Sequence, residues 1–131
     1  MKVLFVCKHN RFRSKIAEAF FNYHKSSGSE AKSAAVAIDP SVPFVSPNVK
    51  YALKEKGISG VSDKPAMLND KLVDWADKIV LVADNVDTNL FPAKKLEVWS
   101  VHDCSQSDLE CIIDRRDIIE KKVLSLLKRL K

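Results

Sequence analysis

The sequence has few cysteines, no long apolar run and no internal repeat. Its three cysteines, at positions 7, 104 and 111, form no Cys-x-x-Cys pair. Neither a disulfide framework nor a zinc site is indicated, and we expect reduced thiols. No stretch approaches the roughly 18 apolar residues of a membrane span, and Met1-Lys2 precedes only four apolar residues, too few for a signal peptide. We therefore expect a soluble, cytoplasmic protein with no metal, no cofactor and no membrane partner.

The length and charge of the chain indicate one domain with anionic substrates. At 131 residues the chain suits a single domain spanning residues 1–131. The net charge is +5. Much of the positive surplus lies in two places. One is a cluster near the N-terminus, Lys8, Arg11, Arg13 and Lys15, and the other is the final residues 128–131. The first cluster would attract anions, whereas the last complements a helix C-terminus. Acidic and basic residues otherwise alternate without a nucleic-acid motif, so no nucleic-acid partner is expected.

Strand and helix patterns alternate along the chain. Short runs of apolar or small residues predict strands at residues 3–6, 31–38, 78–83 and 96–101. Apolar spacing of three and four residues predicts helices from residue 14, over 47–56, from 67 to 76 and from 107 onward. Ser107-x-x-Glu110 is a capping-box pattern at the start of the last helix. The alternation predicts an α/β domain whose parallel sheet is covered on both faces.

Cys7 lies between the first predicted strand and the first predicted helix. The helix N-terminus offers backbone N–H groups without partners and the positive end of the helix dipole. Arg13 adds a planar fork of donors, so the loop suits a phosphate-like dianion. The same field favours thiolate over thiol, which makes Cys7 a candidate nucleophile. The alternative is a small buried side chain that ends a strand.

The remaining residues of this loop are candidates for binding or support. Asn10, in the middle of the loop, suits a left-handed backbone conformation and a structural role. Ser14 is a candidate hydrogen-bond donor to the Cys7 sulfur, with a helix N-cap as its alternative role. The candidate substrate-binding set is the whole run after Cys7, namely Lys8, His9, Asn10, Arg11, Phe12, Arg13 and Ser14.

Polar residues also follow two later strands. Asp84-Asn85 and His102-Asp103 come directly after predicted strands, whose carboxyl ends share one edge of a parallel sheet. Asp103 is the candidate general acid that protonates a leaving group and then, as a base, activates water. His102 is the rival proton donor. The alternative role of Asp103 is a turn or capping residue before the last helix.

These motifs together resemble one known family. The string Cys7-Lys-His-Asn-Arg-Phe-Arg-Ser14 with Ala17-Glu18-Ala19, and Asp103 shortly before a C-terminal helix, resembles the low-molecular-weight protein tyrosine phosphatases. Thioredoxin-coupled arsenate reductases share their fold. The resemblance implies a three-layer α/β fold of the phosphatase I type, with a central four-stranded parallel sheet in flavodoxin-like order. It implies a cysteinyl-phosphate on Cys7, with Asp103 as general acid and base.

The resemblance carries further expectations for the site. Arg13 would hold the phosphate, and phosphate-like oxyanions would inhibit. Ser41 and Asp84 fall where the family places residues that support the loop.

Three positions depart from the family pattern. His9 stands where the loop usually has glycine, and Phe12 stands where many phosphatases have a second loop cysteine. Cys104-Ser105 follow Asp103 where the family has proline and then an aromatic side chain that walls a phenyl ring. Because of these departures, the sequence does not identify the organic group of the phosphate ester, and it does not establish phosphotyrosine as the substrate.

Two other functions remain as alternatives. In arsenate reduction, Cys7 attacks arsenate and two further cysteines pass a disulfide outward to thioredoxin. Cys104 and Cys111 have a usable spacing, but the relay of the resembled reductases follows the central strand, where residues 82–90 contain no cysteine. The third function is a non-catalytic anion-binding module.

The two later cysteines also have simpler interpretations. A buried structural thiol accounts for Cys111. Cys104, next to Asp103, is a candidate partner for a protective disulfide with Cys7.

Overall fold

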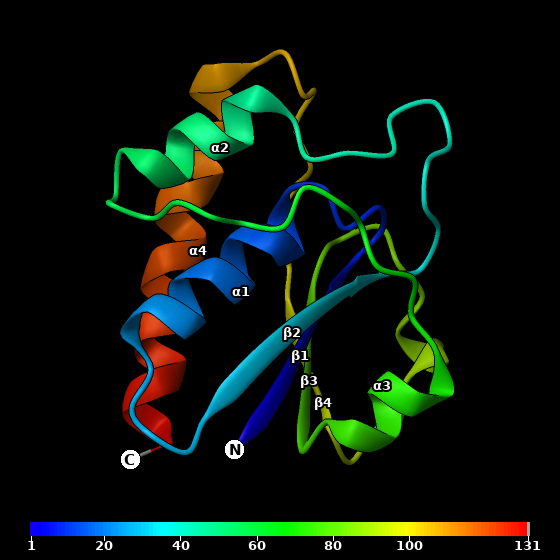
Figure 1. Cartoon of the computed structure of the whole chain (residues 1–131). Coiled ribbons are helices and arrows are strands. Elements are labelled where there is room, and N and C mark those ends of the chain that lie inside the picture. Colours follow the sequence, from blue (N-terminus) through cyan, green and yellow to red (C-terminus); the bar gives the residue numbers. More distant parts are fainter. Residues whose placement is uncertain (131) are drawn as a thin grey trace.

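The computed structural model describes residues 1–130, which form a parallel four-stranded sheet with helices on both faces (Figure 1). The strand order is β2-β1-β3-β4, and all neighbouring strands are parallel. This confirms the expected α/β class and flavodoxin-like order. Along the chain the elements are β1 (Lys2–Cys7), α1 (Arg13–His24), β2 (Glu30–Ala35), α2 (Pro47–Lys54), α3 (Asp70–Trp75), β3 (Lys78–Val82), the 3-10 turn η1 (Thr88–Leu90), β4 (Leu96–Trp99) and α4 (Leu109–Arg129).

The two central strands are buried on both faces. Residues 3–6 of β1 and 79–82 of β3 are all fully buried, as expected for continuous apolar runs in a parallel sheet. Outward from them, β4 retains exposed and half-buried residues. The core therefore centres on β1 and β3.

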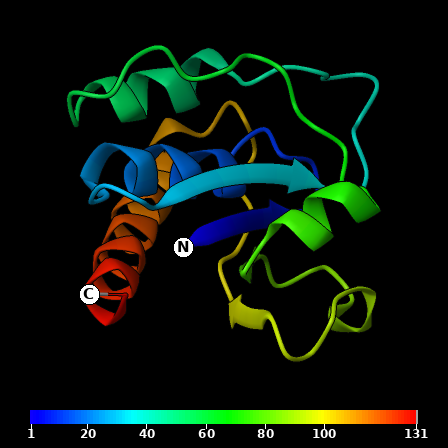
Figure 2. The ribbon, with the colours of Figure 1, turned by 60° about the horizontal axis from the view of Figure 1, so that its bottom comes forward.

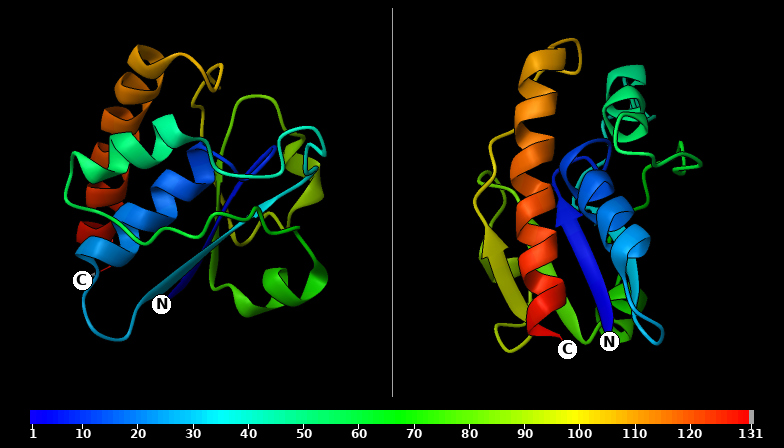
Figure 3. Two further views of the ribbon diagram at one scale, coloured as in Figure 1. Left: turned by 45° about the horizontal axis from the view of Figure 1, so that its top comes forward. Right: turned by 90° about the vertical axis from the view of Figure 1, so that its left-hand side faces the viewer.

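The helices divide between the two faces of the sheet. Phe5 and Val80 point into a core shared with α1 and α4, whereas Leu4 and Leu81 point to the opposite face, against Ala76 and the side chains of α3. Figure 2 shows α3 on one side of the sheet and α1 with α4 on the other. The short α2 contacts α1 and α4 and lies outside them, away from the sheet (Figure 3).

Local signals explain where several elements begin. α2 begins at Pro47, as the sequence predicted, and the Oγ of the preceding Ser46 accepts the Val49 N–H at 3.3 Å. The cap predicted for α4 was wrong. Asp108, not Ser107, precedes this helix, because the Asp108 carboxylate accepts the Cys111 N–H at 3.1 Å.

Several elements are shorter than predicted, among them β3, which ends at Val82, and α2, which ends at Lys54. The strand expected at 31–38 ends at Ala35, whose N–H and C=O pair with Ala66 and Leu68 of the loop before α3. The strand expected at 96–101 ends at Trp99. The helix expected from 67 starts at Asp70, after Asn69 accepts the Leu72 N–H at 2.8 Å.

The carboxyl ends of all four strands lie at one edge of the sheet, at the top of Figure 1. The segments 8–12, 36–46, 83–87 and 100–108 leave the sheet there. Among residues 1–130, no helix combines the length and apolarity needed to cross a bilayer.

Candidate active site

Cys7 is the last residue of β1, and its sulfur has two close partners. The residue is 2% exposed. Its Sγ lies 2.9 Å from Ser14 Oγ and accepts the Asn10 N–H at 3.3 Å. Because Ser14 Oγ already accepts a hydrogen bond from Asn10 Nδ2 at 2.7 Å, its own proton is available for the sulfur. Two donors thus point at Cys7 Sγ.

Asn10 organises the loop from within. It is fully buried and has φ 51°, the left-handed conformation that the sequence predicted. Besides donating to Ser14, its Oδ1 accepts the Ala66 N–H at 2.8 Å. Asn10 therefore joins the Cys7 loop to the segment between α2 and α3.

Ser14 does not cap α1. The capping position is Phe12, which makes no side-chain cap hydrogen bond, and Ser14 lies inside the helix. The alternative role of Ser14 as N-cap is therefore wrong. The first turn of α1 also contains no acidic residue, so the helix itself supplies no negative side chain at its positive end.

Arg13 joins the loops that follow three strands. Its side chain is 1% exposed. Nη1 donates to Val101 O at 2.8 Å, and Nη2 donates to Asn85 Oδ1 at 3.1 Å. Asp84 Oδ1 and Asp103 Oδ2 each lie 3.6 Å from the guanidinium. The polar clusters predicted to share one sheet edge meet at this side chain.

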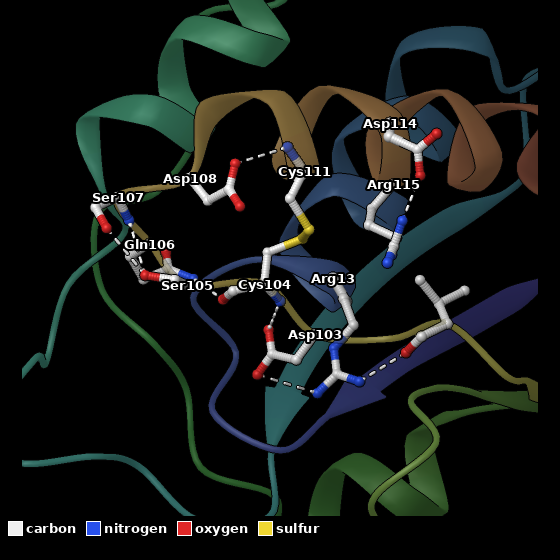
Figure 4. Close-up of a disulfide and its surroundings, with 11 residues drawn as sticks. Arg13, Asp103, Cys104, Ser105, Gln106, Ser107, Asp108, Cys111, Asp114 and Arg115 are labelled. Carbon is white, nitrogen blue, oxygen red and sulfur yellow. Dashed lines mark hydrogen bonds and ion pairs between the residues drawn. A yellow bond between two sulfur atoms is a disulfide. The ribbon is translucent and has the colours of Figure 1, made fainter.

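Asp103 faces Arg13 from the segment before α4 (Figure 4). Its other oxygen, Oδ1, accepts the Cys104 N–H at 2.9 Å, and the residue is exposed. Asp103 does not cap α4, since Asp108 does so. The rival proton donor His102 is mostly exposed and pairs with Asp84, not with the loop.

The outer part of the Cys7 loop is held by the segment after β2. His9 Nδ1 lies 2.7 Å from Ala37 O, and Arg11 Nη1 lies 3.1 Å from Asp39 Oδ2. Ser41 donates to the same carboxylate through its N–H and Oγ at 3.0 and 2.7 Å. The Ser41 hydroxyl, with Arg11, lowers the pKa of Asp39 to about 2. Ser41 thus acts on the loop indirectly, through Asp39.

Lys8 and Phe12 differ in what they can offer an anion. The Lys8 side chain is half-buried at the loop. Phe12 is 2% exposed and belongs to the main core, so only its backbone can contact a ligand. Of the predicted substrate-binding set, Phe12 can therefore contribute only its backbone.

A family model described as low molecular weight phosphotyrosine protein phosphatase matches residues 2–131. The chain belongs to this family. No curated protein matches the sequence.

Solved structures similar to this member of the phosphatase family include both phosphatases and arsenate reductases. The YwlE arginine phosphatase from Geobacillus stearothermophilus is 26% identical, with a TM-score of 0.86 over 98% of this chain and 92% of that one. An arsenate reductase from Archaeoglobus fulgidus is 32% identical, with a TM-score of 0.81 over 96% and 98%. A low molecular weight protein tyrosine phosphatase from T. tengcongensis is 25% identical, with a TM-score of 0.85 over 98% and 99%. Family membership thus supports an enzyme of one of these two activities.

This member of the phosphatase family has a disulfide between Cys104 and Cys111 (Figure 4). The expectation of three reduced thiols was wrong, as were a free Cys111 and a Cys104 pairing with Cys7. The first turn of α4 brings the two Cα atoms to 6.0 Å, a separation that a disulfide can bridge. Within residues 1–130, Cys7 is the free cysteine. Spacing in sequence alone could not reveal the pairing.

Proposed function

We propose that the protein is a cysteine-dependent phosphatase that hydrolyses phosphate monoesters. One observation carries the proposal: a free thiol with two hydrogen-bond donors lies in a loop closed by buried Arg13, which faces the Asp103 carboxylate at 3.6 Å. A nucleophile, an anion-binding group and a proton donor are the three parts that ester hydrolysis by this route needs.

In the first step, the Cys7 thiolate attacks phosphorus in line with the ester bond. The S–P bond forms while the P–O bond to the organic group breaks. The backbone amides at the start of α1 and the Arg13 guanidinium hold the phosphoryl oxygens. Asp103 gives its proton to the leaving oxygen, which departs as an alcohol or phenol.

In the second step, water hydrolyses the cysteinyl-phosphate. The Asp103 carboxylate takes a proton from the water, whose oxygen attacks phosphorus as the S–P bond breaks. Cys7 leaves as a thiolate, and the Ser14 hydroxyl and Asn10 N–H are placed to stabilise it. Inorganic phosphate is released and the starting state returns.

The substrate class follows less directly from the site. Phosphotyrosine is one candidate, because the matched family is described as phosphotyrosine phosphatases. Phosphoarginine belongs in the same assay, because a similar solved structure is an arginine phosphatase. Lys8, half-buried at the loop, adds a positive charge beside Arg13, which favours a substrate with negative charge near the phosphate; the charge of Arg11 is offset by Asp39.

The deciding experiment measures hydrolysis of p-nitrophenyl phosphate, phosphotyrosine and phosphoarginine. We expect Cys7→Ser to abolish turnover. We expect Asp103→Asn to reduce it by about 10² to 10⁴ on substrates with poor leaving groups. A wild-type protein that hydrolyses neither ester, or a fully active Cys7→Ser variant, contradicts the proposal; hydrolysis of phosphoarginine alone, which breaks a P–N bond, would replace the ester by a phosphoramidate as substrate. Phosphate binding without turnover would instead identify an anion-binding module.

Arsenate reduction is the second candidate, and the disulfide favours it. In such a relay, Cys7 would bind arsenic and Cys104 would attack the Cys7 sulfur, so that arsenite leaves with the electron pair. Cys111 would then attack Cys104, giving a Cys104–Cys111 disulfide and a free Cys7, which is the thiol state seen here. Thioredoxin-coupled arsenate turnover that is lost in Cys111→Ser would support this function, and its absence beside phosphatase activity would exclude it.

A further inference from the structure

The disulfide lies directly beside the proposed general acid. Cys104 follows Asp103, and its N–H binds the Asp103 carboxylate (Figure 4). We propose that the Cys104–Cys111 disulfide positions Asp103, and that a dithiol reductant slows acid-assisted hydrolysis by opening it. This inference rests on the proposed phosphatase function.

Few other contacts hold the segment that carries Asp103. Residues 100–108 connect β4 to α4 without regular structure. Val101 O accepts from Arg13 Nη1, and Gln106 O accepts from Asn48 Nδ2 at 3.0 Å. Between these two points, His102 pairs with Asp84. Among residues 1–130, the Asp103 side chain itself reaches another segment only through Arg13. The disulfide adds a covalent link one residue away.

The other end of this link is firmly placed. Cys111 lies in the first turn of α4, where Asp108 caps its N–H. The next residue, Ile112, is fully buried in the core that α4 shares with α1. Because α1 carries Arg13, the disulfide fixes Asp103 relative to the same pair of helices that fixes the phosphate-binding arginine.

Opening the link leaves the nucleophile chemically unchanged. A small dithiol transfers two electrons and two protons to the disulfide, giving the Cys104 and Cys111 thiols and the cyclic disulfide of the reductant. Both sulfur-bearing residues are half-buried, whereas Cys7 is buried at the end of β1 and already a thiol. The expected effect is therefore confined to the placement of Asp103.

Leaving-group dependence tests this effect specifically. Phenolate needs a proton more than p-nitrophenolate does, so phenyl phosphate should report on Asp103 and p-nitrophenyl phosphate much less. With the disulfide open, in Cys111→Ser or in dithiothreitol-treated wild type, we expect kcat/KM for phenyl phosphate to fall about tenfold or more and kcat/KM for p-nitrophenyl phosphate to fall by less than about threefold. The ratio kcat/KM reports the first step alone, whereas kcat also includes the second step, in which Asp103 acts as base for both esters. Ser107→Ala, a change in the same segment that keeps the disulfide, is the matched control.

A double variant separates positioning from general loosening. In the Asp103→Asn background, Cys111→Ser should cause no further loss on phenyl phosphate. Equal losses of kcat/KM on the two esters, no loss on either, or a further loss in the Asp103→Asn background would each overturn the inference while the phosphatase proposal stands.

Hydrogen exchange provides a readout that does not depend on activity. We expect the amides of residues 102–106 to exchange faster in Cys111→Ser than in wild type or Ser107→Ala. Unchanged exchange would overturn the inference even if the protein hydrolysed no ester. If the wild type hydrolysed no ester but Cys111→Ser exchanged faster, the phosphatase proposal would be wrong and the role of the disulfide in holding residues 102–106 would stand.

Discussion

Asn10 offers a sharp test of how the Cys7 loop is held. It combines a positive φ with two hydrogen bonds from a fully buried side chain. Replacing it with alanine removes both bonds and puts a Cβ-bearing residue without polar compensation at φ 51°. Replacing it with glycine removes the same bonds but suits the backbone. The two variants therefore separate the contribution of side-chain bonding from that of conformation.

The size of each contribution can be estimated from the two hydrogen bonds and the backbone angle of Asn10. Two buried hydrogen bonds at about 0.5–1.5 kcal/mol each amount to about 2 kcal/mol. The left-handed conformation adds about 1–2 kcal/mol for alanine. We expect the free energy of unfolding to fall by about 3.5 kcal/mol in Asn10→Ala and about 2 kcal/mol in Asn10→Gly. At about 4 °C per kcal/mol for a chain of this size, the Tm should fall by about 14 and 8 °C.

Thermal and urea unfolding, followed by circular dichroism at one buffer and pH, would measure both variants. Asn10→Gly must be the more stable of the two. If glycine destabilises as much as alanine, backbone conformation contributes nothing at this position. If neither variant loses stability, the bonds to Ser14 and Ala66 do not hold the loop.

Three further predictions concern binding, pH and packing. Inorganic phosphate at about 100 times its Kd should stabilise the wild type by about 2.7 kcal/mol, and Arg13→Met should remove that shift in a thermal-melt titration. The Arg129 hydrogen bond, with those of Trp99 and Lys78, lowers the pKa of Glu97 to about 2 from 4.5. The folded state then binds this proton more weakly than the unfolded state, so the stabilisation is complete above about pH 4.5 and is lost as pH falls toward 2. The stability difference between wild type and Glu97→Gln should shrink over that interval; a constant difference would refute the assignment. Arg116 is buried and donates to Ala52 O and Glu55. We expect Arg116→Ala to lower the free energy of unfolding, measured in urea, by about 2–3 kcal/mol, and Asp117→Asn to lower it by less than about 1 kcal/mol. Equal losses would contradict the role of the buried arginine.

Local signals made the central features predictable. The apolar run of β1 and the loop-to-helix boundary before α1 are visible in neighbouring residues, as is the Ser46-Pro47 start of α2. The left-handed Asn10 also followed from residue type and position. Each of these depends on interactions within a few residues, which a single sequence records directly.

The specific partners in contacts between distant segments could not be read from the sequence. Arg13 donates to Val101 O and to Asn85; the sequence placed Asp84-Asn85 at the same sheet edge, but no local pattern marks the Val101 carbonyl as a partner of Arg13. The choice of Asp108 over Ser107 as the cap of α4 depends on how the preceding segment approaches the helix. The Cys104–Cys111 disulfide depends on that same approach. The number of residues between two cysteines does not give the distance between their Cα atoms when the path of the backbone is unknown.

The buried side chain of Phe12 restricts how this site can be redesigned. Packing against the core fixes one position in the middle of the ligand-binding loop. Random mutagenesis of the loop should therefore return variants at Lys8, whose side chain leaves the core, and almost none at Phe12. A library restricted to Lys8 would change the charge around a bound ester and leave in place the contacts that His9 and Arg11 make with the segment after β2.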